Sequence, residues 1–251
     1  MAFGAHVQSV QVVNTSVANG GSASFASITV TATNTLLCAV RYGGGTTGTQ
    51  HISDDKGNTW ATDKTVDNST TDRLVVHRCS SPAAGATVVS LTIDTGGPIS
   101  VRAALAEYEG TCTLDQSPGA FDPVDELTLD SGSATTTVAA ELLFGAGCIG
   151  GLGTFTAGAS YTLRQQVPAA PSTKICIEDR VVSSTASYNA TFTTTASAGT
   201  GSNCIMCSYY AATPNQNFLT LLGVASALPI GPLIWALEWL RQRKNKIWRF
   251  R

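Results

Sequence analysis

The sequence has few charged residues, three histidines and none of the short motifs that mark the common enzyme families. Lys, Arg, Asp and Glu make up only 13% of the 251 residues, a balance that favours short strands over long solvated helices. The chain contains no G-x-S-x-G elbow, H-E-x-x-H helix or G-x-x-x-x-G-K-[ST] loop, which excludes the standard hydrolase, zinc-protease and phosphate-loop sites. We therefore expect an all-β protein that is not an enzyme and that binds neither a cofactor nor a metal.

The seven cysteines cannot all pair within one chain, because their number is odd. Five lie in apolar, strand-like runs, where a free cysteine behaves as a small core residue: Cys38, Cys148, Cys176, Cys204 and Cys207. The spacing of "CIMC" is typical of zinc and redox sites, but residues three apart on a strand point to opposite faces and cannot share a metal ion. We expect buried, free thiols at these positions.

An internal repeat runs through most of the chain, with an offset of about 100 to 106 residues. The segment "SITVTATNTLLCAV", from Ser27, matches "SATTTVAAELLFGA", from Ser133. The segment "AALAEYEG", from Ala103, matches "IMCSYYAA", from Ile205, and three blocks between them match in the same order. We infer a duplicated unit, with one repeat at residues 1–110, a second at 111–213 and a separate C-terminal segment at 214–251.

Each repeat has the pattern of a β-sandwich. Hydrophobic and small polar residues alternate in "SITVTAT" and "ATVVSLTI", as in half-buried strands, and turn clusters such as "DDKGN" and "DTGGP" separate the strands. About five short strands per repeat predict a jelly-roll-like β-sandwich. The pattern leaves open whether the repeats form one merged sandwich or two packed in tandem.

Three motifs resemble those of a loose family of phage and bacterial surface β-sandwich proteins. These are the turn "SDDKGNTW", the strand "ALAEYEG" followed by "LDQSPG", and the opening "ELLFGAG" of the second repeat. The resemblance covers about residues 25 to 212 and rests on structural signatures. It implies a sandwich fold in a virion or on a cell surface, and it implies no activity.

Carboxylates and aromatic residues near the end of the first repeat provide an alternative function. Glu107 and Glu109 are two residues apart on a predicted strand, so they share one face at a separation close to that of glycosidase carboxylates. Together with Trp60 and Tyr108 they would make a carbohydrate-binding or carbohydrate-cleaving site. The competing interpretation places both glutamates on a solvated face of the sheet.

A second group of acids lies in the "SDDKGN" turn. Asp54 and Asp55 could join Asp94 or Asp130 as oxygen ligands of a calcium ion. Alternatively, the two side chains support the turn itself.

The C-terminal segment differs sharply from the rest of the chain. Residues 1–240 carry nine Lys and Arg residues against seventeen acids, whereas residues 241–251 carry six basic residues and no acid. Residues 218–240 contain a single charge, at Glu238, but Pro229, Gly231 and Pro232 interrupt the run and disfavour a straight spanning helix. We expect an amphipathic helix from Pro232 to about Phe250 that lies in or on a membrane, docks in an assembly or packs on its own sandwich.

The contacts expected of this segment are of two kinds. The hydrophobic contacts to a membrane or assembly are Phe218, Leu221, Leu222, Leu233, Trp235, Leu237, Trp239, Leu240 and Trp248. The basic tip consists of Arg241, Arg243, Lys244, Lys246, Arg249 and Arg251.

These features predict a structural or surface-display protein of a virion or cell surface, associated with membranes or with an assembly. The start "MAFGAHVQSVQVV" lacks the basic and apolar segments of a signal peptide, so none is expected. Expected partners are other copies or other proteins of an assembly, membrane lipid and, in the alternative, a glycan. Because the body is acidic, nucleic acid is expected to bind only at the basic tip.

Overall fold

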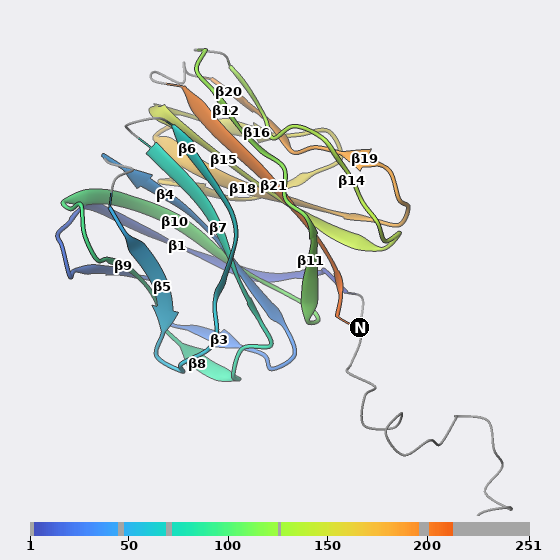
Figure 1. The fold of residues 1–251 in the computed structure, drawn as a ribbon, viewed down its shortest axis with the longest axis horizontal. Coiled ribbons are helices and arrows are strands. Elements are labelled where there is room, and N and C mark those ends of the chain that lie inside the picture. The colour runs from blue at the N-terminus through green and yellow to red at the C-terminus, as the bar shows by residue number, and fades with distance from the viewer. Residues whose placement is uncertain (1–2, 45–47, 69–71, 125–126, 196–200, 213–251) are drawn as a thin grey trace, which may run out of the picture. The chain divides into compact units, whose positions relative to one another are not determined.

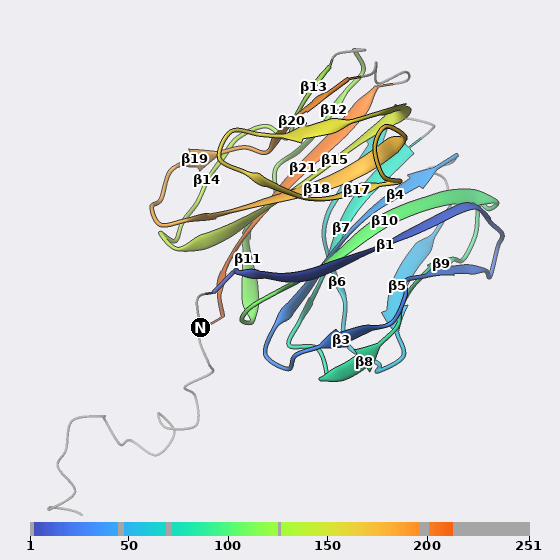
Figure 2. The same cartoon turned by 180° about the vertical axis from the view of Figure 1, so that it is seen from behind.

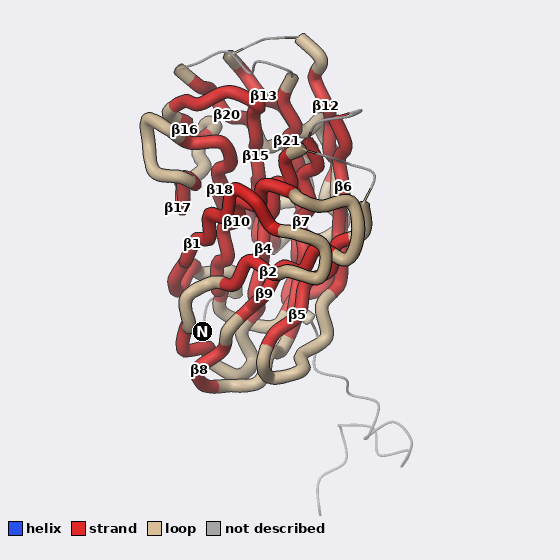
Figure 3. Tube along the Cα trace, turned by 90° about the vertical axis from the view of Figure 1, so that its left-hand side faces the viewer, coloured by secondary structure: helices blue, strands red, loops and turns tan. Residues whose placement is uncertain are grey.

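The computed structural model describes residues 3–44, 48–68, 72–124, 127–195 and 201–212, and every regular element in these ranges is a β-strand (Figure 3). The all-β prediction is confirmed for this part of the chain. The predicted C-terminal helix, its hydrophobic contacts and its basic tip lie outside the described residues.

The first half of the chain forms a large antiparallel sheet and two small ones. In spatial order the large sheet contains β1 (His6–Val17), β10 (Ile99–Tyr108), β4 (Thr35–Gly43), β7 (Asp72–Ser80) and β6 (Ala61–Asn68). One small sheet contains β2 (Ser22–Ser24), β9 (Val89–Ile93) and β5 (Gln50–Asp54), and the other contains β3 (Ile28–Val30) and β8 (Gly85–Thr87). A buried core that includes Val40, Leu91 and Leu105 joins the large sheet to the small ones, and we call this half the first sandwich.

The second half has the same strand order. Its large sheet contains β11 (Cys112–Gln116), β21 (Ser202–Ala211), β15 (Glu141–Gly153), β18 (Thr173–Val182) and β17 (Thr162–Val167), and β12 (Gly119–Asp122) also pairs with β21. Its small sheets contain β13 (Thr128–Asp130), β20 (Thr191–Thr194) and β16 (Phe155–Ala157), and β14 (Ala134–Thr135) with β19 (Ser187–Tyr188). A core around Leu143, Phe192 and Met206 joins these sheets into the second sandwich.

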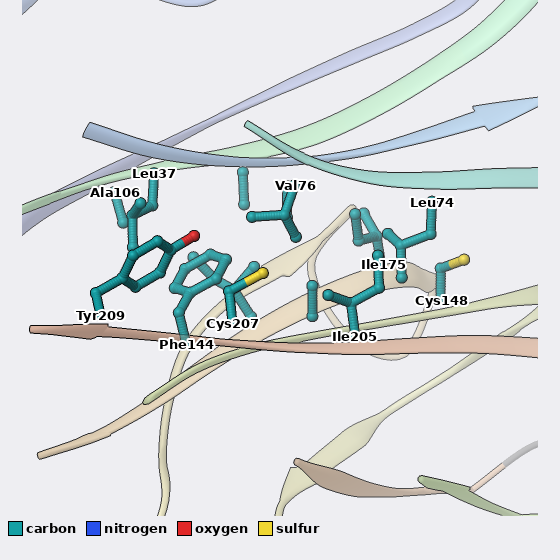
Figure 4. Close-up of a cluster of buried hydrophobic side chains, with 14 of the residues drawn as sticks. Leu37, Leu74, Val76, Ala106, Phe144, Cys148, Ile175, Ile205, Cys207 and Tyr209 are labelled. Carbon is teal, nitrogen blue, oxygen red and sulfur yellow. The ribbon is translucent and has the colours of Figure 1, made fainter. Parts of the chain in front are cut away.

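The two large sheets pack face to face, so residues 3–212 form four layers with the two small sheets of each sandwich on the outside (Figure 1). Between the large sheets lies a third hydrophobic core, which we call the central core. In Figure 4, Leu37, Val76 and Ala106 from the first sandwich meet Phe144, Ile205 and Tyr209 from the second. The question left open by the sequence is thereby answered, because two sandwiches pack back to back rather than merging into one.

Strand β4 shows what this layering does to sequence pattern. Leu37 and Ala39 point into the central core, whereas Leu36 and Cys38 point into the core of the first sandwich, and the whole strand is buried. A strand covered on both faces needs apolar residues at every position, so it loses the alternation that marks a half-solvated strand. The edge strand β1, by contrast, keeps an alternating pattern of exposure.

The packing of the large sheets is reciprocal. Strand β1 of the first sheet contacts β17 of the second, and β6 contacts β12 and β21; Figure 2 shows β1 beside β17. In the order of the strands, β1 corresponds to β11 together with β12, and β6 corresponds to β17. Each sandwich therefore presents the same face to the other. This is the arrangement of an isologous interface about a two-fold axis.

Two β-bulges at matching places fix the correspondence between the sandwiches. Strand β6 shifts register against β7 between Thr62 and Lys64, and β17 shifts against β18 between Leu163 and Gln165. A bulge re-aims the residue that it leaves unpaired, here Asp63 and Arg164. Each makes a salt bridge to the neighbouring strand, Asp63 to Arg78 at 3.0 Å and Arg164 to Asp179 at 2.8 Å, so the charges are exchanged between the sandwiches.

Each of these salt bridges is covered by a tyrosine from the other sandwich. The Tyr209 hydroxyl donates a 2.8 Å hydrogen bond to Asp63 Oδ2, and Arg78 lies 5.9 Å from the centroid of the Tyr209 ring. Tyr108, at the corresponding place in β10, lies near Asp179, and burial together with that carboxylate raises the pKa of its phenol well above the usual value. The Tyr108 hydroxyl has no hydrogen-bond partner among the described residues, so the two tyrosines hold corresponding places but only Tyr209 makes the hydrogen bond across the sandwiches.

The ladders correct the alignment of the last repeat block. The sequence match paired Ala103 with Ile205, which placed Glu107 opposite Tyr209. Both β10 and β21 pair with the central strand of their own sheet, and these ladders together with the bulges place Ala104 opposite Ile205, so Glu107 corresponds to Ser208. Successive side chains of a strand alternate between faces, so the one-residue error would have put every side chain on the wrong face.

The cysteine prediction is confirmed: all seven are free and buried. Cys204 faces the core of the second sandwich, whereas Cys207 faces the central core. The two thiols of "CIMC" therefore lie on opposite faces of β21, as the strand geometry requires.

We predict that Tyr209→Phe lowers the free energy of unfolding by about 1.5–3 kcal/mol, because the variant loses a hydrogen bond to a buried carboxylate. Urea unfolding of the variant, of Asp63→Asn and of the double variant measures the coupling between the two side chains. The control is Tyr210→Phe, a partly exposed tyrosine on the same strand. Additive effects of Tyr209→Phe and Asp63→Asn would show that the contact across the two sandwiches contributes nothing.

Candidate functional site

A small cavity opens at the edge of the first sandwich. It has a volume of about 90 Å³ and is lined by Tyr42, Gln50, Thr62, Thr65, Arg73, Val75 and His77. Strands β4, β7 and β6 of the large sheet supply all of these residues except Gln50, which comes from β5 of the small sheet. The space is several times the ~10–15 Å³ that one water molecule needs.

The bulge in β6 places two hydroxyl groups at this cavity. Thr62 and Thr65 are three residues apart, a spacing that puts side chains on opposite faces of a regular strand. Because the register shifts between Thr62 and Lys64, both threonines line the cavity, while Asp63 turns to Arg78. One irregularity therefore serves both the cavity and the interface between the sandwiches.

Three of the lining residues carry a buried polar atom that lacks a hydrogen-bond partner among the described residues. These atoms are Tyr42 Oη, Gln50 Nε2 and His77 Nε2. Tyr42 is 1% exposed and His77 is 6% exposed. Leaving a buried donor or acceptor unpaired costs about 1–3 kcal/mol, and such groups in native proteins call for an explanation.

The lining is uncharged or internally neutralised near pH 7. Burial lowers the pKa of His77 to about 4, so its imidazole is neutral, and its Nδ1 lies 3.0 Å from Thr62 Oγ1. Burial also raises the pKa of Tyr42, so its phenol stays protonated. The Arg73 guanidinium makes two hydrogen bonds to Asp67, at 2.7 and 3.1 Å, and these raise the pKa of Arg73.

The second sandwich has hydrophobic core residues at three of the corresponding positions. The ladders put Ile149 at the position of Tyr42, Phe155 at that of Gln50 and Cys176 at that of Val75. All three are buried in the core of that sandwich, at 2% exposure or less. The fold therefore tolerates apolar side chains at these three positions, whereas the ladders put the polar Gln166 at the position of Thr65.

At the position of His77 the second sandwich has Glu178, which is fully buried. Its Oε2 accepts a 2.8 Å hydrogen bond from Gly158 N, and its Oε1 has no partner among the described residues. Burial raises the pKa of this carboxyl to about 8. Gly145 makes room for it, since a Cβ there would lie 2.7 Å from Glu178 Cγ.

Glu107, one glutamate of the predicted carbohydrate site, makes hydrogen bonds inside the protein. Glu107 is fully buried, which corrects the expectation of a solvated face. Its Oε1 accepts hydrogen bonds from Thr31 N at 2.9 Å and Asn34 Nδ2 at 2.7 Å, and its Oε2 accepts one from Gln8 Nε2 at 2.6 Å. The carboxylate thus fastens the β3–β4 turn and the edge strand β1 to β10.

The other members of that predicted site lie apart from Glu107. Tyr108 is 1% exposed and faces the central core, on the opposite side of β10 from Glu107. Glu109 is partly exposed and pairs through its backbone with Gly4 and Ala5. A glycan that touched both Glu107 and Tyr108 would have to enter two different cores.

Asp54 and Asp55 stabilise the "SDDKGN" turn by accepting hydrogen bonds. Asp54 accepts hydrogen bonds from Lys56 N, Asn58 N, Asn58 Nδ2 and the Trp60 indole, at 2.7–3.1 Å. Partial burial opposes ionisation, but these hydrogen bonds hold the pKa of Asp54 below its usual value. Asp55 accepts a 2.9 Å bond from Val88 N. The turn-supporting interpretation is confirmed, and Trp60 packs as part of this turn against the first sandwich.

The cavity residues were missed because sequence alone gave no signal for them. Tyr42 and His77 lie in runs that read as core strands, and Gln50 lies 27 residues before His77. Only the bulge and the approach of β5 bring them together. The residues expected to contact a membrane or an assembly lie outside the described ranges, within which no helix is long and apolar enough to cross a membrane.

We predict that Glu178→Gln stabilises the protein at alkaline pH. The folded pKa of about 8 lies above the ordinary 4.5, so the wild-type carboxyl favours folding fully below pH 4.5, and this contribution is lost as pH rises to 8 and beyond. The amide keeps the hydrogen-bond acceptor and has no charge to bury. Melting temperatures measured from pH 4.5 to 9 should agree at acid pH and diverge in favour of the variant, by about 2–4 °C per kcal/mol. A difference independent of pH would contradict the assignment.

Comparison of this chain with known protein families, with characterised proteins and with solved structures found no match. The resemblance to phage and bacterial surface sandwiches therefore stays a prediction that rests on the three motifs.

Proposed function

We propose that this chain is a non-enzymatic structural protein of a virion or cell surface. In this proposal residues 1–212 form a rigid body for display, and residues 213–251 attach that body to other copies, to other proteins of an assembly or to lipid. The observation that carries the proposal is the central core, which joins two sandwiches into one continuous four-layer unit.

The central core favours a building block over two modules that move independently. Interfaces between mobile domains are commonly more polar and resemble transient protein contacts. Here buried apolar residues of both large sheets meet, and the Tyr209 bond to Asp63 crosses between the sandwiches. Only three residues separate β10 from β11, so the linker adds little freedom.

We also propose that the body arose by duplication of one jelly-roll-like sandwich. The shared strand order, the matching bulges and the reciprocal interface all support this origin. An isologous interface is the form that two copies of one chain make, so a homodimer fused end to end would have this arrangement.

The sequence of residues 213–251, an apolar run followed by a basic tip, supports their attachment role. An apolar run of this length exposed to water would be a large hydrophobic patch, and such patches mark interaction sites. The cationic tip that follows it suits anionic lipid or another acidic surface, including the acidic body of a neighbouring copy.

The alternative, a carbohydrate-binding or carbohydrate-cleaving module centred on Glu107 and Glu109, has less support. The Glu107 carboxylate is committed to three internal hydrogen bonds. A hydrolase screen with Glu107→Gln tests this alternative, and glycan turnover abolished by the substitution would favour it over the structural role.

We predict that a chain ending at Ala212 folds and stays monomeric, whereas the full chain associates with itself or with anionic vesicles. Circular dichroism reports folding, and sedimentation with and without phosphatidylserine vesicles reports association. Trp235→Glu with Trp239→Glu should weaken association and leave the fold intact. The matched control, Trp235→Phe with Trp239→Phe, keeps the apolar face and should associate like the wild type.

Replacing the six basic residues of the tip by glutamine separates the two kinds of partner. Loss of vesicle binding with self-association retained points to a lipid partner at the tip. A chain ending at Ala212 that unfolds would contradict the division into body and attachment segment. A folded truncation that still associates would contradict the attachment role.

A further inference from the structure

We propose that the cavity of the first sandwich binds a small, neutral, hydroxyl-bearing molecule: a short polyol, a single sugar or the terminal unit of a longer glycan. This inference is independent of the structural role proposed above. It rests on the unpaired polar groups around the cavity, on their lack of net charge and on the apolar residues that replace Tyr42 and Gln50 in the second sandwich.

The unpaired groups define what a ligand must supply. Gln50 Nε2 is a donor that needs an acceptor, whereas Tyr42 Oη and neutral His77 Nε2 can each take part as donor or acceptor. A hydroxyl group both donates and accepts, so two or three hydroxyls on one small molecule can satisfy this mixed set. The hydroxyls of Thr62 and Thr65 extend the same chemistry along the wall.

The charged groups around the cavity disfavour an anionic ligand. Arg73 is the one cation among the lining residues, and Asp67 already holds it through two hydrogen bonds. Its Nη1 also donates a 2.9 Å bond to Gln50 Oε1, which fixes the amide so that Nε2 is the group left over. A carboxylate or phosphate would have to compete with Asp67 for Arg73.

The apolar surface of Val75 and the volume of the cavity suit one face of a sugar ring or a hydroxymethyl group. Val75 lies between the polar ends of the cavity and offers an apolar surface for carbon-bound hydrogens. With about 90 Å³, the cavity holds part of a small molecule, and the remainder stays in solvent on the open side. A longer glycan could therefore bind through its terminal residue alone.

The second sandwich provides the internal comparison. There buried Phe155 and Ile149 occupy the positions of Gln50 and Tyr42, although Glu178, with its unpaired Oε1, stands at the position of His77. At Gln50 and Tyr42, a lining kept only for stability would gain from the same substitutions, since they remove unpaired buried groups. That the first sandwich keeps these two polar residues points to a ligand that pairs with them.

The test uses the full-length protein with glycerol, glucose, galactose, N-acetylglucosamine and inorganic phosphate as separate probes. Saturation-transfer difference NMR detects weak binding, and calorimetric titration gives affinities. We expect at least one neutral probe to bind and phosphate not to bind. Binding should be unchanged between about pH 5.5 and 8.5, because His77 and Tyr42 do not titrate in that range.

Two substitutions locate the binding. Tyr42→Phe removes one unpaired hydroxyl without changing shape, so it should keep or raise the melting temperature and weaken binding about ten-fold. Gln50→Phe copies the second sandwich and should abolish binding. Tyr188→Phe, on a small sheet of the second sandwich, is the matched control and should bind like the wild type.

Several outcomes would overturn the proposal. They are the failure of every neutral probe to bind, binding of phosphate in preference to the neutral probes, and undiminished binding by folded Gln50→Phe. If Gln50→Phe does not fold, Tyr42→Phe decides alone, and unchanged affinity in that variant contradicts the assignment. If an oligosaccharide bearing the bound sugar at its end binds more tightly than the free sugar, the terminal unit of a glycan is identified as the source.

Discussion

The apolar contact between the two large sheets is the constraint on which the rest of the structure depends. It buries both faces of β4 and β15, so these strands lose the alternation of a solvated sheet and become almost wholly apolar. Each sandwich presents the same face to the other, and bulges at matching places position Asp63 and Arg164 for salt bridges to the neighbouring strand. The acid and the base of the salt bridge are exchanged between the two sandwiches, so the position of the ion pair is retained although the residue types differ.

The two sandwiches divide the tasks that one fold can serve. At corresponding places the second sandwich has Phe155 and Ile149 in its hydrophobic core, whereas the first has Gln50 and Tyr42 around a cavity. The bulge in β6 is what allows one strand to face the cavity with Thr62 and Thr65 and the interface with Asp63. Two halves with the same strand order thereby differ in the residues at this place.

The sequence was informative where a local pattern determines the outcome. Strand content, the burial of the cysteines and the hydrogen-bonded Asp54 turn follow from composition and spacing. Register did not follow, since a shift of one residue moves Glu107 opposite Ser208 and exchanges the faces of the strand. The burial of Glu107 also depends on partners 73 to 99 residues away in the chain, Asn34, Thr31 and Gln8. The cavity depends on a bulge and on a separate sheet, which no short pattern encodes.

The central claim is that residues 3–212 form one cooperative unit through the central core, and differential scanning calorimetry of the full-length protein tests it most directly. The account predicts a single transition whose calorimetric and van't Hoff enthalpies agree. Leu91→Ala in the first sandwich and Phe192→Ala in the second should both move that same transition to lower temperature, since both residues are fully buried. Two resolved transitions, each sensitive to only one of these substitutions, would contradict it.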